Sequence, residues 1–434
     1  MTIRSLSSRS SSTQLYAWTL ANLDDRLQGS RFLTDRRPAA TPHTNEQRIY
    51  ILGIGNVGRL FAACLAKLEA RLPITLVVNR LELLQEWAKS PGVEMVRNGT
   101  SQRITEFDIE WWTDQPPPQG PIREPASGQT INNLIITTKA SQALPQVDRL
   151  LPYLDQSSTI AFAQNGMCKL WPPLGAIYVK DRFPPGSEPS WLACVVTHGV
   201  TSLGPFKSLH ASPAGVMVGS VSNSKSGPAT SSSNFLSRQL CNAPDLEAKS
   251  VSQQQLWIAQ LEKLAVNIVI NPLTAILNCK NGEILVDRGD DLPKLIRTLL
   301  SETSQVFQAL VEDASSESVL VDDDTRHESQ CDSARLAMAR AALIKRFSPD
   351  NLMAIVYSVG AKVAENTSSM LQDTLCGKPT EIHDLNGWLI ETQKALCAGK
   401  SRLPVNQALI DLVTRGEKLG RKELCDYLLS FSPQ

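Results

Sequence analysis

Residues 48–68 read RIYILGIGNVGRLFAACLAKL, a short apolar strand followed by glycines in the spacing GxGxxG and then by an apolar helix. The glycines permit a tight turn and a close approach of backbone to a pyrophosphate, and the helix N-terminus offers unpaired N–H groups to phosphates. A second apolar strand, Ile74–Val78, follows at the interval of a βαβ unit. The stretch therefore predicts a Rossmann-type dinucleotide-binding domain. Its predicted cofactor contacts are Gly53, Gly55, Asn56, Val57 and Gly58.

The residues after the second strand bear on which dinucleotide binds. Where NAD-binding folds place an acid to hold the ribose hydroxyls, this chain has Asn79 and Arg80. A guanidinium suits a 2′-phosphate, so the sequence favours NADPH over NADH and makes Arg80 a cofactor contact.

Two further apolar stretches, Asn133–Thr138 and Ser158–Ala163, end just before polar residues. Ligands of open parallel sheets sit beyond the carboxyl ends of the strands, so Lys139 and Asn165 are candidate cofactor contacts. The alternative is that each is an ordinary turn residue, since Asn165-Gly166 is a common turn dipeptide.

The composition of the chain changes along its length. Trp191–Ser220 is rich in β-branched residues and glycine, which predicts more strands, whereas the pattern from Gln253 onward is helical. We expect an α/β domain at residues 48–250, followed by an all-α domain at residues 251–434. Three stretches have the composition of loops or insertions: Gln115–Ser127, Ser222–Ser233 and Ser315–Ser329.

The second informative segment is KLAVNIVINPLTAILNCKNGE, residues 263–283. As a helix it is apolar nearly all round, which is typical of a buried helix. The polar side chains that share one sector of it are Lys263, Asn267, Asn271 and Thr274. Buried polar groups either satisfy one another or await a polar ligand. Pro272 should kink the helix and free a backbone carbonyl.

The composition of the 434 residues narrows the possible partners. Forty-three basic residues balance forty-three acidic ones, so no global field recruits nucleic acid or an anionic membrane. The nine cysteines contain no CxxC pair and the five histidines have no metal-ligand spacing, so we expect free thiols and no metal. No apolar run is long enough to span a membrane.

The first residues, MTIRSLSSRSSSTQLYAWTL, are rich in serine and carry two arginines but no acid. This composition is that of a mitochondrial transit peptide, and a flexible tail is the equal alternative. We expect residues 1–47 to be such an extension, with folded sequence beginning near Arg48. The protein is then mitochondrial or cytoplasmic, with the composition favouring the mitochondrion.

Six motifs in order resemble those of the ketopantoate reductase family, the NADPH-dependent enzymes of pantothenate synthesis. They are GIGNVG, Lys139, QNGM, KLAVNIVINPLTAILNCKNGE, AENTSSMLQD and TEIHDLNGWL. The resemblance spans about residues 48–425. It implies that a small-molecule substrate, ketopantoate, binds between the two domains and is reduced to pantoate. The expected assembly is a monomer or a homodimer.

The resemblance also implies roles for residues. Lys263 would protonate the carbonyl oxygen as hydride arrives, and Glu381 would hold the substrate hydroxyl. The implied substrate contacts are Asn267, Asn271, Asn281, Asn366 and Ser369. Elementary chemistry agrees, because hydride addition develops negative charge on oxygen and burial lowers a lysine pKa. A simple alternative for Glu381 is a helix-capping or surface acid.

Two other functions stay open. One is a related 2-oxo acid reductase on the same scaffold, since groups other than Lys263 would select the substrate. The other is a noncatalytic mitochondrial factor that keeps the reductase scaffold. The retained lysine, carboxylate and glycine loop argue against it.

Cys168 departs from the family pattern, because a glycine often follows NGM at this position in the family.

Overall fold

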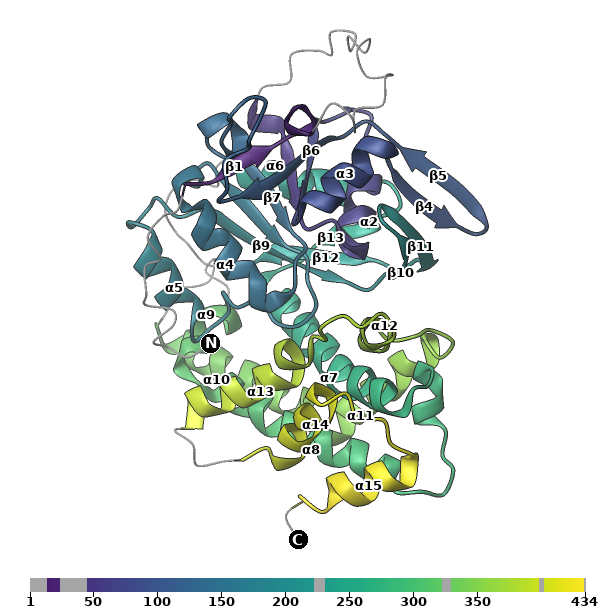
Figure 1. The fold of residues 1–434 in the computed structure, drawn as a ribbon. Coiled ribbons are helices and arrows are strands. Elements are labelled where there is room, and N and C mark those ends of the chain that lie inside the picture. The colour runs from purple at the N-terminus through teal and green to yellow at the C-terminus, as the bar shows by residue number, and fades with distance from the viewer. Residues whose placement is uncertain (1–13, 24–44, 222–230, 322–328, 398–401, 433–434) are drawn as a thin grey trace. The chain divides into compact units, whose positions relative to one another are not determined.

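A computed structural model describes residues 14–23, 45–221, 231–321, 329–397 and 402–432. They form two compact units (Figure 1). The first, here called the sheet unit, comprises the described residues up to Gln164 together with Cys168–Leu256. The second, the helical unit, comprises Asn165–Met167 and the residues from Trp257 onward. The predicted order of an α/β domain followed by a helical domain is confirmed, although the division falls inside a helix after Leu256.

The sheet unit is built on a nine-stranded sheet with the order β1-β6-β3-β2-β7-β8-β9-β12-β13. The six strands that run from β6 to β9 in this order are mutually parallel. In sheet order these are β6 Asp108–Thr113, β3 Ile74–Val78, β2 Ile49–Leu52, β7 Asn133–Ile136, β8 Thr159–Phe162 and β9 Ser190–Val196. The remaining members are β1 Tyr16–Trp18, β12 Val216–Ser220 and β13 Ala248–Ser250.

Four of the central strands, β2, β3, β7 and β8, were predictable because they are buried on both faces. Every residue of β2, β3, β7 and β8 is buried, so each reads as a continuous apolar run instead of an alternating one. The helices of this unit are α2 Asn56–Leu65, α3 Leu81–Lys89, α4 Ala140–Leu150, α5 Gly175–Arg182 and α6 Ser231–Asn242.

A smaller sheet, with the order β10-β11-β4-β5, packs against α2. Its strands are β10 Gly199–Gly204, β11 Lys207–Ser212, β4 Val93–Arg97 and β5 Thr100–Ile104. The strands expected within 191–220 are thus divided between two sheets. The β4–β5 hairpin had no apolar signal, since β5 is mostly exposed.

The expected start of folded sequence near Arg48 is wrong, because Tyr16–Trp18 already form β1. This strand pairs antiparallel with β6. Trp18 is buried, lies 5.1 Å from the Trp111 ring, and donates from Nε1 to the Gln115 carbonyl at 2.8 Å. A three-residue strand is too short to show periodicity, so only tertiary pairing reveals it. The rest of the expected extension, residues 1–13 and 24–44, lies outside the described residues.

The helical unit is organised around α8, Leu292–Glu312, which contacts α10, α11, α13, α14 and α15. The other elements are α7 Gln253–Leu277, whose first four residues belong to the sheet unit, η6 Asn281–Leu285, α9 Glu317–Leu320, α10 Ser329–Arg346, α11 Pro349–Lys362, α12 Ser369–Leu375, α13 Ile382–Cys397, α14 Pro404–Thr414 and α15 Arg421–Leu429.

Parts of the expected loops are helical. Within Ser315–Ser329, residues Glu317–Leu320 form α9, while 322–328 lie outside the described residues. Residues 222–230 of the serine-rich stretch also lie outside them, and α6 begins at Ser231. Gln115–Ser127 contains only the start of the short 3₁₀ helix Pro125–Gly128.

Helix α7 continues through Pro272. Because proline has no N–H, the carbonyl of Ile268 loses its helical donor, and Asn386 Nδ2 donates to it instead at 3.1 Å. The same amide donates to Asn406 Oδ1 at 2.9 Å, and Asn406 in turn donates to Glu302. The freed carbonyl that the sequence predicts is therefore present, and a buried amide satisfies it.

Candidate functional site

The helical unit brings together the lysine and the carboxylate that the sequence singled out. Lys263 Nζ donates to Asn165 Oδ1 at 3.0 Å, and Asn165 Nδ2 donates to Glu381 Oε2 at 3.1 Å. One amide thus connects the ammonium and the carboxylate, which lie 118 positions apart in the sequence. Asn165 was expected among the cofactor contacts, and its amide belongs to this cluster.

The environment of Lys263 changes its acidity. Burial lowers the pKa of its ammonium from 10.5 to about 8, and the negative charge of Glu381 opposes that shift. The pKa of Lys263 is lowered because the side chains of α7 are apolar on nearly all sides, so that little water reaches the charged ammonium. A lysine with a pKa near physiological pH can both hold and release a proton.

The turn that carries Asn165 depends on glycine. Gly166 has a φ of +81°, and a Cβ at this position would lie 2.9 Å from the Asp384 carbonyl oxygen. The backbone therefore approaches the first turn of α13 closely, which places Asn165 beside Glu381. The two interpretations of Asn165-Gly166, a turn and a site residue, are compatible.

The rest of the polar stripe on α7 divides into two kinds of residue. Thr274 is internally satisfied, because its hydroxyl donates to the Ile270 carbonyl and meets Ser368 Oγ, both at 2.7 Å. Asn271 Nδ2 donates to Ser369 Oγ at 3.4 Å, so two predicted substrate contacts adjoin. Asn267 makes no side-chain hydrogen bond to another described residue, and its amide is half-buried.

Asn281 and Asn366 are neighbours through their backbones. The Asn281 N–H donates to the Asn366 carbonyl at 3.1 Å, and a Cβ on Gly282 would lie 2.6 Å from that of Ala364. The side-chain oxygen of Asn281 is buried and has no hydrogen-bond partner among the described residues. Leaving a buried acceptor unpaired costs about 1–3 kcal/mol, so it is a group that a donor would satisfy.

The glycine loop of the sheet unit fits a dinucleotide. Gly53 has a φ of +97°, and a Cβ on Gly58 would lie 2.1 Å from the Gly53 carbonyl oxygen, so the fold itself requires both glycines. A Cβ on Gly55 would meet nothing within 4 Å. The open space at Gly55 is the room that a pyrophosphate needs. No side chain caps α2 there and no acid lies in its first turn, so its N–H groups can receive an anion.

The other predicted cofactor residues lie at the same edge of the sheet. Gly53 follows β2, Arg80 follows β3 and Lys139 follows β7, and these three strands are adjacent and parallel. The Arg80 side chain is 60% exposed and its Nε lies 3.9 Å from the Glu82 carboxylate, an exposed ion pair that contributes little. Thr137, which no sequence motif singles out, donates its hydroxyl to the Gly53 carbonyl and braces the loop.

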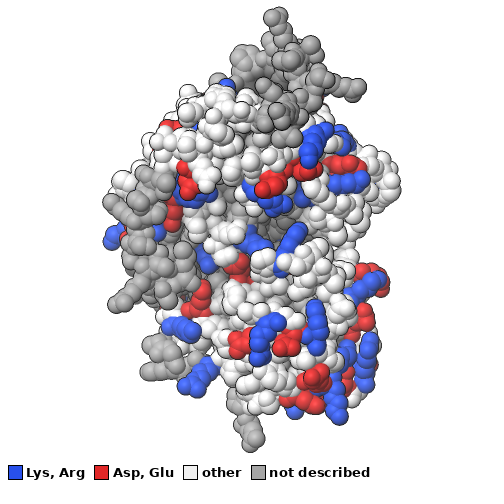
Figure 2. Space-filling model, in the orientation of Figure 1, with Lys and Arg blue, Asp and Glu red and all other residues white. Residues whose placement is uncertain are grey.

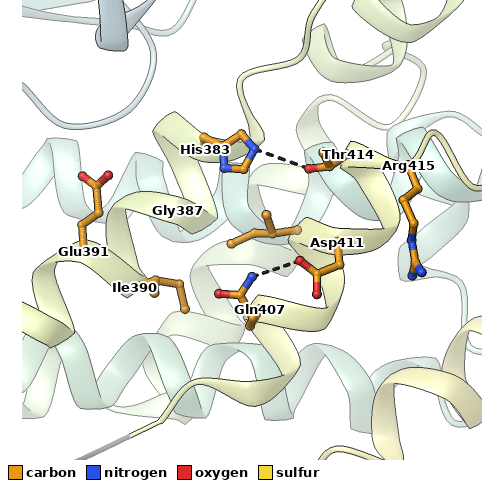
Figure 3. Close-up of a pocket in the computed structure, with 9 residues that line it drawn as sticks. His383, Gly387, Ile390, Glu391, Gln407, Asp411, Thr414 and Arg415 are labelled. Carbon is orange, nitrogen blue, oxygen red and sulfur yellow. Dashed lines mark hydrogen bonds between the residues drawn. The ribbon is translucent and has the colours of Figure 1, made fainter. Parts of the chain in front are cut away.

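A cavity of about 480 Å³ lies elsewhere in the helical unit, between α13 and α14. Figure 3 shows its walls, with His383 facing Thr414 at 3.4 Å and Gln407 donating to Asp411 at 3.0 Å. None of the predicted site residues lines it. This hollow is therefore separate from the cluster around Lys263.

The charges, the metal-ligand side chains and the helix lengths of the described residues bear on three other classes of site. On the face that Figure 2 shows, charged side chains of both signs are interspersed over the helical unit. The described residues contain no group of three or more metal-ligand side chains, and their cysteines are free thiols. Among the described helices, none is long and apolar enough to cross a membrane.

Comparisons with known proteins agree with these observations. The family described as Ketopantoate reductase PanE/ApbA matches residues 49–223, and its C-terminal counterpart matches residues 255–417. A ketoisovalerate reductase of Gibberella fujikuroi is 41% identical, over 96% of this chain and 95% of its own. A probable 2-dehydropantoate 2-reductase of Schizosaccharomyces pombe is 28% identical, over 79% of this chain and 89% of its own. The crystal structure of a probable 2-dehydropantoate 2-reductase from Bacillus subtilis has the same fold, with a TM-score of 0.55 at 20% identity, covering 85% of this chain and all of its own.

Proposed function

Because this chain belongs to the ketopantoate reductase family, we propose that it reduces a branched 2-oxo acid to the 2-hydroxy acid with NADPH. The observation that carries the proposal is the cluster in which Asn165 joins the partly buried Lys263 to Glu381. A lysine whose pKa is lowered to about 8, held beside a carboxylate, suits proton transfer and supports an enzyme over a scaffold kept only for binding.

Lys263 is the proposed general acid. Reduction places negative charge on the carbonyl oxygen, and a nearby ammonium stabilises that charge and then gives up its proton. The side-chain oxygen of Asn165 accepts a hydrogen bond from the ammonium, and this bond fixes the directions of the other two N–H groups. The lowered pKa makes the transfer easier than from an ordinary lysine, because less free energy is needed to form the neutral amine.

The proposed substrate contacts are Glu381, Asn267, Asn271, Asn281, Asn366 and Ser369. The asparagines and Ser369 offer amide and hydroxyl groups to the substrate carboxylate, and Glu381 offers its carboxylate to any hydroxyl on the substrate. Asn267 and the side-chain oxygen of Asn281 have no side-chain partner among the described residues, so a ligand would not have to displace an existing bond.

The glycine loop, Arg80 and Lys139 are the proposed cofactor contacts, and Asn165 stays a proposed contact as well. The bound nicotinamide would supply the hydride. The open space at Gly55 and the uncapped start of α2 would hold the pyrophosphate. The exposed guanidinium of Arg80 would meet a 2′-phosphate, which is the reason for proposing NADPH over NADH.

Ketoisovalerate is the substrate we favour, and ketopantoate, expected from the sequence motifs, is the second candidate. Ketopantoate carries a hydroxymethyl group where ketoisovalerate has a hydrogen, so only ketopantoate offers a hydroxyl. A site built only for the hydroxyl rejects the analogue that lacks it, because a buried polar group is left unpaired. Here Glu381 already accepts a hydrogen bond from Asn165, so its carboxylate keeps a partner when the substrate has no hydroxyl. Relatives named ketoisovalerate reductase, 41% and 39% identical over 96% of this chain, support the same choice.

The test is the rate of NADPH oxidation, followed by absorbance, when either 2-oxo acid is added to the purified protein. We expect turnover with both and a higher kcat/KM for ketoisovalerate, with NADH and the Lys263→Ala variant run in parallel. A kcat/KM for ketopantoate more than about 100-fold higher would make it the substrate. Cofactor binding without turnover of either acid would favour the noncatalytic alternative.

A further inference from the structure

Arg59, the residue after the last loop glycine, is buried inside the sheet unit with 8% of its surface exposed. Its Nε donates to the carbonyl of Ile54, which lies inside the glycine loop, at 3.1 Å. Its Nη1 faces the turn between β10 and β11 and donates to the carbonyls of Gly204 and Lys207 at 2.8 and 2.7 Å. The guanidinium therefore joins the phosphate loop to the smaller sheet.

A serine on the smaller sheet completes the connection. Ser208 Oγ accepts from Arg59 at 3.1 Å and donates to Asn56 Oδ1 at the same distance. Asn56 is the first residue of α2 and part of the GxGxxG motif. The Arg59 side chain and its partner Ser208 thus hold the glycine loop at two points, Ile54 and Asn56.

The charge of Arg59 has no counter-ion among the described residues. Every group that accepts from its guanidinium is a neutral carbonyl or hydroxyl. Burial lowers its pKa to about 10, so the side chain stays protonated at physiological pH. By contrast, Arg182, whose side chain is similarly buried, is paired with Asp148 at 3.0 Å. Buried cations are normally paired with an anion. The Arg59 guanidinium has no such partner among the described residues and donates to the glycine loop, which is open at Gly55, so we expect an anion to bind at that loop.

We propose that Arg59 is a positioning residue of the phosphate site, which fixes the glycine loop and adds a positive charge behind it. The proposal rests on the proposed function, since it takes the pyrophosphate of the dinucleotide as the anion. The charge acts across the backbone at Gly55, where the structure leaves open space, so Arg59 need not touch the ligand.

The test compares ADP, which carries a pyrophosphate, with adenosine, which does not. Each is used to displace NADPH from the purified protein, and the displacement is followed by nicotinamide fluorescence. Arg59→Met keeps an unbranched apolar side chain without the charge and the N–H donors, and should weaken ADP about 10- to 100-fold while leaving adenosine within about threefold. Arg182→Met, which removes a buried but paired arginine, should change neither. The kcat of Arg59→Met at saturating NADPH should stay within about threefold of wild type, so the loss appears in KM.

Three results would overturn the assignment. Unchanged ADP affinity in Arg59→Met is one, and equal losses for ADP and adenosine, which indicate general damage to the fold, are another. If Arg59→Met does not fold, Arg59→Lys is the deciding variant, because it keeps the charge but loses the several N–H groups with which the guanidinium binds the loop and the smaller sheet. Arg59→Lys should weaken ADP binding about three- to tenfold, and an unchanged ADP affinity would contradict the positioning role of Arg59. A wild-type protein that binds neither NADPH nor ADP would instead refute the proposed function, and the inference with it.

Discussion

The ionisation of Lys263 sets a pH dependence on which the proposed chemistry can be judged. Its pKa is about 8, so about nine in ten molecules carry the proton at pH 7 and about one in ten at pH 9. Carbonyl reduction needs the protonated form. The kcat/KM should therefore be nearly level below about pH 7 and fall about tenfold per unit above about pH 8. Oxidation of the hydroxy acid, which needs the neutral amine, should rise over the same range.

Two substitutions separate Lys263 from other titrating groups. Glu381→Gln removes the charge that raises the lysine pKa, so the fall in rate should begin at lower pH than in wild type. Lys263→Ala should lower kcat about 10²- to 10⁴-fold and abolish the pH dependence, while leaving NADPH affinity almost unchanged. The assay is NADPH oxidation at saturating cofactor, with the fold of each variant checked by circular dichroism.

The reasoning would be refuted if Lys263→Ala kept the same alkaline decline, or if Glu381→Gln moved it to higher pH. Stability gives an independent check. A pKa lowered in the folded state means that the folded protein bears the cost of the charged lysine below about pH 8, and the cost is relieved as pH rises toward 10.5. The shift corresponds to about 3 kcal/mol. Lys263→Met should thus resist urea better than wild type at neutral pH, with the advantage shrinking as pH rises.

Three further predictions test other parts of the structure. Arg80→Ala should weaken NADPH binding at least about tenfold and NADH binding little, as measured by fluorescence titration; equal losses for both would contradict a 2′-phosphate contact. Asn386→Ala should lower the free energy of unfolding by about 2–3 kcal/mol in urea, because it strips the Ile268 carbonyl of its donor. The loss should be smaller in a Pro272→Ala background, where residue 272 regains an N–H, and an undiminished loss would disprove that explanation. Trp18→Ala should cost about 3 kcal/mol by removing the buried side chain of β1, whereas Ile122→Ala, at a residue 68% exposed, should cost almost nothing. If the two are equal, β1 adds nothing to the stability of the sheet.

The sequence alone determined the parts that local chemistry controls. The glycine spacing after Ile49–Leu52 predicts the phosphate loop because the backbone requires glycine at Gly53, with its φ of +97°, and at Gly58, where a Cβ would meet the Gly53 carbonyl. The buried parallel strands were readable because burial on both faces leaves a continuous apolar run. Lys263 stood out because it is a charged residue in a helix whose other residues are nearly all apolar.

Tertiary structure alone decided how distant residues meet. Nothing local to Asn165 shows that its amide joins Lys263 to Glu381, because hydrogen bonds across such separations depend on the packing of whole helices. Nor does the sequence reveal that Arg59 has no counter-ion among the described residues, since pairing depends on which groups the fold brings to it. Strand β1 is the same case, because three residues have no periodicity and become a strand only when β6 offers them hydrogen-bond partners.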